Sequence, residues 1–327
     1  MHTIFYSSFL IPHSLFLISH FLLNPIHPKN PSSAYLCLSL ILNMPERICV
    51  CGAGTMGSGI AQSMAQNGFD TILFDLNPAV LEQAKAGIEK NLSGLLEKNK
   101  ISPDQKDLTI KKLNFTSDIG ECRADIIIEA IVEIETAKTE LFSQLASNNK
   151  KETILATNTS SLSVTAIARK IIHPERVIGM HFFNPAPLMK LVEVVITDFT
   201  DEQTKSKILE LVKSIGKTAV CCKDTPGFIV NHVARPYYLE ALRLIEEGIS
   251  DFETIDKLME NSGFKMGPFK LMDLIGNDIN FAVSNSVYES MNKPIRLKPS
   301  FIQEQKVLKN ELGKKTGKGY YDYQKQD

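Results

Sequence analysis

Short apolar runs alternate with stretches of helical spacing along most of the chain. Apolar residues that recur every three or four positions, as in Val80, Ala84, Ile88 and Leu92, indicate an amphipathic helix. Strands that alternate with helices are typical of a parallel sheet with right-handed crossovers. An α/β domain is therefore expected. Its predicted strands are Ile48–Cys51, Thr71–Phe74, Ala124–Ile128, Ile154–Ala156, Val177–His181, Leu191–Ile196 and Ala219–Cys222.

The pattern changes near Thr225–Ile229, after which no strand is evident and helical spacing dominates. A domain boundary is expected there. It divides the body into a larger α/β domain, 45–227, and a smaller all-helical C-terminal domain, 228–327. The segments with helical spacing are Tyr237–Glu247, Phe252–Asn261 and Asn277–Ser290.

Residues 1–44 differ in composition from the rest, because Lys29 is their only charged residue. A signal peptide would need a positively charged start, and a mitochondrial transit peptide would need arginine. A membrane span needs about 20 cleanly apolar residues, and Pro12 interrupts the apolar stretch Ile4–Leu23. The favoured interpretation is that translation starts at Met44 and that the extension lies outside the native fold. A targeting or anchoring segment is the alternative.

Composition narrows the class of protein. Of the 327 residues, 43% are hydrophobic and 22% are charged, which excludes a disordered polymer or a fibrous rod. The net charge of −1 gives no basic field for nucleic acid. The absence of a CxxC pair indicates reduced core cysteines in a cytoplasmic protein, with no disulfide framework and no metal site. The cysteines are Cys37, Cys49, Cys51, Cys122, Cys221 and Cys222.

A glycine-rich loop follows the first predicted strand. Gly52 allows a tight turn, Gly54 lets the backbone approach a pyrophosphate, and Gly57 lets the next helix pack closely on the strand. The helix that opens at Thr55 and Met56 offers free N–H groups and a positive dipole end to phosphate. This GxGxxG pattern between a strand and a helix predicts a dinucleotide-binding domain of the Rossmann type.

The second predicted strand ends at Asp75, in the position where an acid can bind both hydroxyls of an adenosine ribose. No arginine or lysine lies in residues 75–79, where a 2′-phosphate would need one. The sequence therefore predicts NAD rather than NADP.

Polar residues follow several predicted strands at the edge where α/β folds bind ligands. Ser160 follows one strand, His181 ends another and Asn184 comes just after it, while Glu193 lies further along. Histidine titrates near neutral pH, and a carboxylate bonded to one ring nitrogen would fix its tautomer. The residues alone predict NAD-linked oxidation of an alcohol with a histidine base.

A series of motifs in register resembles the L-3-hydroxyacyl-CoA dehydrogenase family, especially the compact bacterial 3-hydroxybutyryl-CoA dehydrogenases. The resemblance spans roughly Pro45 to Tyr323. It implies oxidation of (S)-3-hydroxyacyl-CoA to 3-ketoacyl-CoA and the reverse reduction, in fatty-acid or butanoate metabolism, by a homodimer. The motifs are GAGTMGSGIAQ, EAIVE, ATNTSSLSVTAIA, GMHFFNPAPLMKLVEVV, CKDTPGFIVN, MGPFKLMDLIGND and GKKTGKGYYDY.

The resemblance also implies roles for single residues. His181 matches the catalytic base and Glu193 its carboxylate partner. Ser160 matches a serine near the substrate oxygen and the nicotinamide, and Asn231 an asparagine that holds the substrate. The implied cofactor contacts are Asn184, Glu133, Lys138 and Lys315, and the implied coenzyme A contacts are Lys98 and Asn91. Asn91 departs from the serine found in some members, which puts that contact in doubt.

Other interpretations stay open for several of these residues. Ser160 and Asn231 could cap helices. Glu133 and Lys98 could be solvated surface charges, and Lys315 could belong to a mobile tail. At the level of function, the alternatives are a sister dehydrogenase acting on a sugar acid such as gulonate, and a non-catalytic NAD-binding structural protein.

Overall fold

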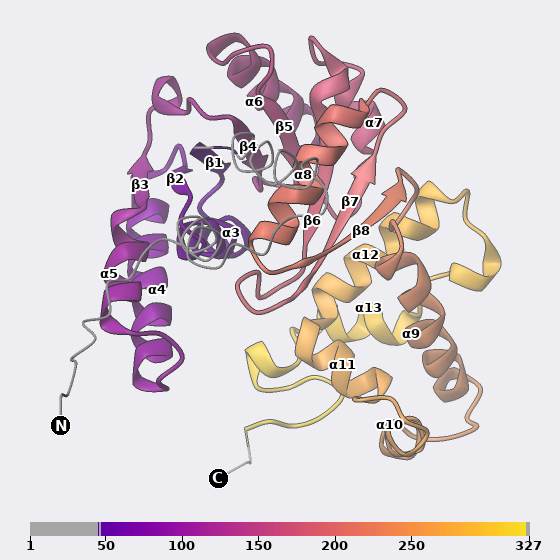
Figure 1. Cartoon of the computed structure of the whole chain (residues 1–327). Helices are drawn as coiled ribbons and strands as arrows, with labels where there is room; N and C mark the ends of the chain where they lie inside the picture. The colour runs from indigo at the N-terminus through magenta and orange to yellow at the C-terminus, as the bar shows by residue number, and fades with distance from the viewer. Residues whose placement is uncertain (1–44, 46, 325–327) are drawn as a thin grey trace, which may run out of the picture.

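A computed structural model describes residue 45 and residues 47–324; the predicted extension lies outside the described residues. Eight strands form a single sheet in the order β3-β2-β1-β4-β5-β6-β7-β8 (Figure 1). The strands are β1 (Arg47–Cys51), β2 (Asp70–Phe74), β3 (Leu113–Thr116), β4 (Ile126–Glu129), β5 (Ile154–Thr157), β6 (Val177–Phe182), β7 (Leu191–Ile196) and β8 (Thr218–Lys223).

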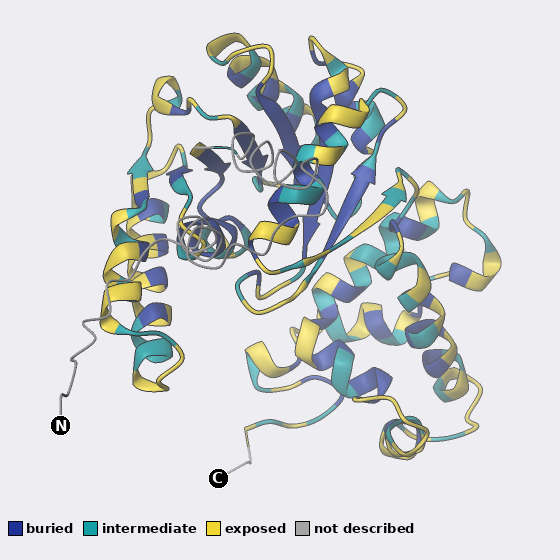
Figure 2. Ribbon diagram, viewed as in Figure 1, coloured by how far each residue is buried: buried dark blue, intermediate teal, exposed yellow. Residues whose placement is uncertain are grey.

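Helices cover both faces of this sheet. On one face, α3 (Thr55–Gln66), α4 (Pro78–Glu97) and α8 (Glu202–Ser214) pack on alternate strand residues. On the other face, α6 (Glu135–Asn148) and α7 (Val164–Ala168) pack on the intervening residues. The central strands are consequently buried on both sides, as Figure 2 shows. Burial on both faces explains why their sequences are nearly continuous apolar runs.

The helical part lies beside β8 and has a core of its own (Figure 1). The expected fold class, an α/β domain followed by a helical domain, is confirmed. The predicted boundary falls in the loop between β8 and α9. The helices of this part are α9 (Val230–Glu246), α10 (Phe252–Asn261), α11 (Pro268–Ile275), α12 (Asn277–Ser290) and α13 (Phe301–Leu308), with short 3-10 turns η3 (Ile295–Leu297) and η4 (Lys314–Thr316).

The prediction of a wholly parallel sheet is wrong at one place. Strand β7 pairs with β6 in the antiparallel sense, and β8 runs parallel to β7. A parallel connection needs a crossover of a dozen or more residues, and residues 183–190 between β6 and β7 are too few for one. The chain therefore turns back on itself at this point.

No range was predicted from the sequence for β3, α5 (Pro103–Lys111), α6, α7, α8, α11 or α13, and the start of α9 was placed too late. The edge strand β3 and the helix before it, α5, have no continuous apolar run or strong helical stripe to reveal them. The first helix of the C-terminal part begins at Val230, well before the predicted Tyr237. Among the residues described, no helix is long and apolar enough to cross a membrane.

Candidate active site

The glycine loop joins β1 to α3 with the geometry that its sequence predicts. Gly52 has a φ of +98°, and a Cβ there would lie 2.6 Å from the carbonyl oxygen of Ala130. A Cβ on Gly57 would lie 1.7 Å from the carbonyl oxygen of Gly52, so only glycine permits this approach of helix to strand. A Cβ on Gly54 would meet no atom within 4 Å, because that residue faces open space.

The N-terminus of α3, at Thr55 and Met56, has no side-chain cap. A helix start with uncapped N–H groups is a binding site for an anion. Together with the open space at Gly54, it fits the pyrophosphate of a dinucleotide.

A cavity of about 520 Å³ adjoins this loop. Asp75 lines it at the end of β2, beside Gly52 and Gly54. One oxygen of Asp75 accepts a hydrogen bond from the Ala53 N–H at 2.8 Å, and the other accepts from the Asn77 N–H at 2.9 Å. A carboxylate has about four lone-pair sites, so both oxygens retain capacity for ribose hydroxyls. The residues that line the cavity include no lysine or arginine, as expected for NAD.

His181 and Glu193 are directly opposite each other on the antiparallel strands β6 and β7. The Nδ1 atom of His181 lies 2.7 Å from Oε2 of Glu193. Glu193 is fully buried and His181 is 6% exposed. The imidazole also packs against the rings of Phe183 and Phe228, with centroids 4.6 and 5.6 Å away. The ring is therefore held in one orientation.

The second oxygen of Glu193 binds the start of α9. Its Oε1 accepts hydrogen bonds from the N–H groups of Ile229 at 3.0 Å and Val230 at 2.8 Å. Burial would raise the pKa of this carboxyl, but the hydrogen bonds to His181 and to these amides outweigh it and lower the pKa. Glu193 is therefore ionised at neutral pH. Asn231 is the next residue along α9, so Glu193 also fixes its position relative to His181.

A second buried ionic network lies at the ends of β4 and β5. Lys138, from α6, is 1% exposed and binds Glu129 at 2.6 Å and Glu133 at 3.2 Å. Burial raises the pKa of Glu129 despite the neighbouring ammonium group. Burial also opposes ionisation of Glu133, but the charge of Lys138 and the hydrogen bonds from Thr159 and Ser160 lower its pKa.

Glu133 holds the loop that carries Ser160. Its Oε1 accepts hydrogen bonds from the hydroxyl of Thr159, from the N–H of Ser160 at 3.0 Å and from the N–H and hydroxyl of Ser161. Asn158 anchors the same loop to β6, because its Oδ1 accepts from the Phe182 N–H at 2.8 Å. Glu133 is partly exposed, with 37% of its side chain accessible, but its carboxylate binds Lys138 and the Ser160 loop.

The residues expected to contact coenzyme A or the cofactor make no described contact with the His181–Glu193 pair. Lys98 and Asn91 are exposed on or at the end of α4, where Asn91 contacts Gln62 at 3.4 Å. Lys315 forms an ion pair with Asp278 at 2.6 Å, within the helical part. Asn184 is exposed after β6. No described contact joins these four residues to the His181–Glu193 pair.

Sequence reasoning gave Glu129 no part in the site, and it gave Asn158, at the start of the candidate stretch, no partner. A signal for Glu129 was present: an acid ends an otherwise apolar strand and precedes a lysine on the next helix. A glutamate that the sheet buries needs a cation nearby. Asn158 had no comparable signal, because its partner is a backbone amide on another strand.

Two family models cover nearly all the described chain. Residues 47–225 match the 3-hydroxyacyl-CoA dehydrogenase NAD binding domain, and residues 227–323 match the C-terminal domain of the same family. The chain belongs to the 3-hydroxyacyl-CoA dehydrogenase family. The prediction of NAD as the cofactor is confirmed.

Relatives agree with this assignment. The 3-hydroxyadipyl-CoA dehydrogenase of Escherichia coli is 46% identical over 85% of this chain and 59% of the relative. The mitochondrial hydroxyacyl-coenzyme A dehydrogenase of Sus scrofa is 39% identical over 85% of this chain and 91% of the relative. A crystal structure of E. coli 3-hydroxybutyryl-CoA dehydrogenase has 44% identity and a TM-score of 0.84, covering 86% of this chain and 60% of that one. The chain thus spans about three fifths of the two E. coli proteins.

The lowered pKa of Glu193 predicts a pH dependence of stability. Its stabilising contribution is complete above the ordinary glutamate pKa of about 4.5 and is lost as the pH falls toward the lower folded value. The difference in free energy of unfolding between the wild type and Glu193→Gln should be constant near neutral pH and shrink below about pH 4.5. Urea unfolding at several pH values measures it. The control is Glu202→Gln, at an exposed residue, which should show no such trend. If the difference in free energy of unfolding between the wild type and Glu193→Gln grows as the pH falls, the lowered pKa of Glu193 is contradicted.

Asp75→Asn removes the charge at the ribose end of the cofactor site while keeping the side-chain shape. Charge-assisted hydrogen bonds are worth about 1.5–3 kcal/mol, so NADH affinity should fall by roughly tenfold or more. The ratio of NADH affinity to NADPH affinity should fall as well. NADH fluorescence titration measures both effects, with Asp70→Asn, at the other end of the same strand, as the matched control. Unchanged NADH affinity would remove Asp75 from the ribose site.

Proposed function

We propose that this chain catalyses the NAD-dependent oxidation of (S)-3-hydroxyacyl-CoA to 3-ketoacyl-CoA, and the reverse reduction, with His181 as general base and acid. The observation that carries the proposal is the buried His181–Glu193 hydrogen bond of 2.7 Å at the edge of the NAD-binding sheet. The family match supports the reaction class. A structural NAD-binding protein has no need for a buried, oriented imidazole.

The cofactor site is formed by the glycine loop and Asp75. Bound NAD⁺ supplies the hydride acceptor for carbon 3 of the substrate. The backbone around Gly54 and the start of α3 bind the pyrophosphate, and Asp75 binds the adenosine ribose. The loop is anchored because Ala53 packs into the core on one face of the sheet and Cys51, just before the loop, packs into the core on the other face.

The proton of the 3-hydroxyl is taken by Nε2 of His181. Glu193 is ionised, so Nδ1 of His181 carries the hydrogen of their shared bond and Nε2 is the basic nitrogen. When Nε2 takes the proton, the imidazolium remains beside a carboxylate in a site from which water is largely excluded. The negative charge of Glu193 offsets the cost of that buried positive charge. In the reduction, the same nitrogen returns the proton.

Ser160 and Asn231 orient the substrate oxygens on either side of this nitrogen. Glu133 accepts from the N–H of Ser160, and Glu193 accepts from the N–H groups of Ile229 and Val230, just before Asn231; both carboxylates have lowered pKa values. Precise placement matters because a misplaced carbon 3 loses the advantage of proximity. Lys98 and Asn91 on α4 are proposed to contact coenzyme A, and Asn184 and Lys315 to lie on the cofactor side.

A short acyl chain is proposed, with 3-hydroxybutyryl-CoA as the first substrate to assay. The relatives that bear this name support the choice. We also propose a homodimer through the helical part. Its large exposed apolar side chains, among them Val233, Leu258 and Phe301, support that contact.

His181→Gln should lower kcat for 3-hydroxybutyryl-CoA oxidation roughly a thousandfold, because the amide cannot accept the proton. NADH affinity should stay close to that of the wild type, since the adenosine site is untouched. Oxidation of 3-hydroxybutyryl-CoA by NAD⁺, followed by the rise in NADH absorbance, measures the rate. His173→Asn is the control, at an exposed histidine whose backbone φ of 63° asparagine tolerates. Near-normal turnover of His181→Gln would rule out its role as base.

A second candidate substrate has a carboxylate at the far end of the acyl chain. Arg235 is 3% exposed, yet no carboxylate of a described residue pairs with it. Its side chain bonds only neutral groups: the carbonyl oxygens of Asn231 and Asn280, and Ser284. Burial lowers the pKa of this guanidinium to about 10. A buried cation without an anion is costly, so a ligand carboxylate would complete the site.

The position of Arg235 fits a six-carbon dicarboxylic acyl group. It lies one helical turn, about 5.4 Å, beyond Asn231 on α9. Three bonds separate carbon 3 of a 3-hydroxyadipyl group from its terminal carboxyl carbon, which is a comparable span. One relative, 46% identical, is named 3-hydroxyadipyl-CoA dehydrogenase.

Arg235→Met keeps the apolar stem and removes the charge. We expect kcat/KM for 3-hydroxyadipyl-CoA to fall about 10- to 100-fold, the effect of one charged hydrogen bond. The value for 3-hydroxybutyryl-CoA should change little. Parallel assays of both substrates measure the ratio, with Arg243→Met on the same helix as the control. An equal loss for both substrates would reveal a purely structural role and contradict the proposal.

A further inference from the structure

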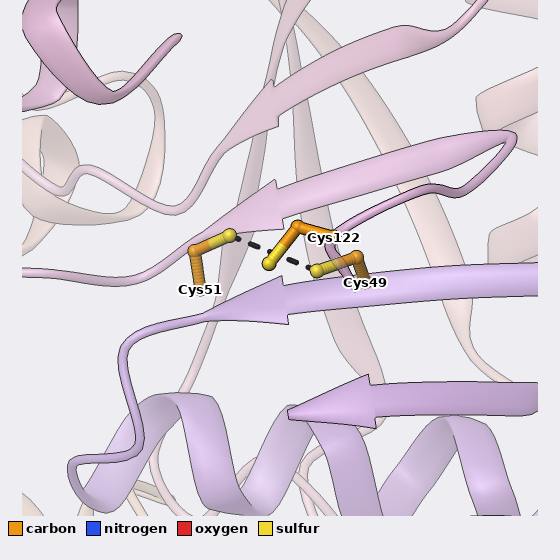
Figure 3. Close-up of side chains that lie close together, drawn as sticks. All are labelled: Cys49, Cys51 and Cys122. Atoms are coloured by element: carbon orange, nitrogen blue, oxygen red, sulfur yellow. Dashed lines mark hydrogen bonds between the residues drawn. The ribbon is translucent and has the colours of Figure 1, made fainter. Parts of the chain in front are cut away.

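Three cysteine side chains meet inside the sheet next to the glycine loop. Cys49 and Cys51 alternate on β1 and so point to the same face, and Cys122 follows the short turn η1 (Ile119–Glu121). All three are fully buried. Their sulfurs lie within 4.8 Å of one another, and those of Cys49 and Cys51 are 3.8 Å apart. Figure 3 shows the three side chains pointing toward one another.

This cluster is joined to the cofactor cavity at two points. Cys51 directly precedes Gly52, and Cys122 ends the turn that begins at Ile119. Gly52 and Ile119 both line the cavity beside Asp75. A change in the positions of the sulfurs would therefore be transmitted to the wall of the cavity through very short lengths of backbone.

The donor set selects a particular kind of metal ion. Thiolates are soft ligands that favour Cu(I) and zinc. A structural zinc ion requires four ligands, and the described residues supply three to this cluster, with no further histidine, cysteine or carboxylate. Sulfurs placed about 2.3 Å from a common ion in a plane lie about 4 Å apart. The present separation of 3.8 Å between two of them is close to that arrangement.

We propose that Cys49, Cys51 and Cys122 form a binding site for a soft, three-coordinate monovalent ion, Cu(I), and that its occupation weakens NAD binding. On binding, three Cu–S bonds replace the S–H bonds of Cys49, Cys51 and Cys122, and three protons leave to solvent. Copper enters and remains as Cu(I), so no electron is transferred.

The effect on NAD follows from the backbone connections. Drawing the Cys122 sulfur onto an ion held by Cys49 and Cys51 shifts the turn η1 against the end of β1, and Ile119 and Gly52 line the cofactor cavity there. Linkage makes the effect reciprocal: bound NADH should weaken Cu(I) binding by the same factor. Because the sulfurs are covered, the ion enters through local opening, and binding should be slower than at an exposed thiol.

The test uses the full chain with the other three cysteines changed to serine, at Cys37, Cys221 and Cys222. Cu(I) is added anaerobically from a chromogenic chelate, and the bound ion is counted by competition and examined by X-ray absorption. We expect one ion per chain with three sulfur ligands at about 2.3 Å. NADH fluorescence titration should show an affinity roughly 5- to 150-fold lower with copper than without it, restored by a chelator.

Cys122→Ala in the same background is the matched variant. It should fail to hold a three-sulfur ion, and its NADH affinity should equal that of the copper-free parent whether or not copper is added. Alkylation mapped by mass spectrometry gives an independent readout on the parent, because copper should protect these three thiols together. Two-sulfur coordination, binding below one ion per chain, or unchanged NADH affinity in the copper-loaded parent would each overturn the proposal.

Discussion

The Glu193 carboxylate is the interaction on which the rest of the site depends. One oxygen binds the imidazole of His181 and the other binds two backbone amides at the start of α9. A buried carboxylate is costly unless its lone pairs are satisfied, and here every partner belongs to the site or to the helix that carries Asn231. The same bonds that keep Glu193 charged therefore fix the helical part against the NAD-binding sheet.

A second ionic group, centred on Lys138, positions the loop that carries Ser160. Lys138 neutralises Glu129 and Glu133, and Glu133 in turn binds the backbone of the Ser160 loop. The resemblance implies that Glu133 and Lys138 contact the cofactor, which stays a prediction, and Glu133 also holds that loop in place. Lys138 and Glu129 are buried, whereas Glu133 is partly exposed and links this ion pair to the loop.

The reversal of the sheet after β6 makes the His181–Glu193 pair geometrically possible. Directly opposed residues on antiparallel strands have neighbouring side chains on one face, and the register places Glu193 opposite His181. A wholly parallel sheet, as first expected, would bring the two residues together only by a long crossover. The error in topology thus concerned the strand reversal that brings His181 and Glu193, the proposed catalytic pair, together.

The sequence by itself determined the parts that depend on local pattern. The glycine loop, the acid at Asp75, most of the buried strands and the change to helices near Thr225 follow from spacing, turn chemistry and continuous apolar runs. The family resemblance added His181 and Glu193 as partners.

Only the tertiary structure decided the direction of β7, the early start of α9, the positioning role of Glu129 and the meeting of the three cysteines. Each of these depends on contacts between segments distant along the chain. Their energies come from burial and from paired charges, and these are fixed only when the sheet and its helices are packed together.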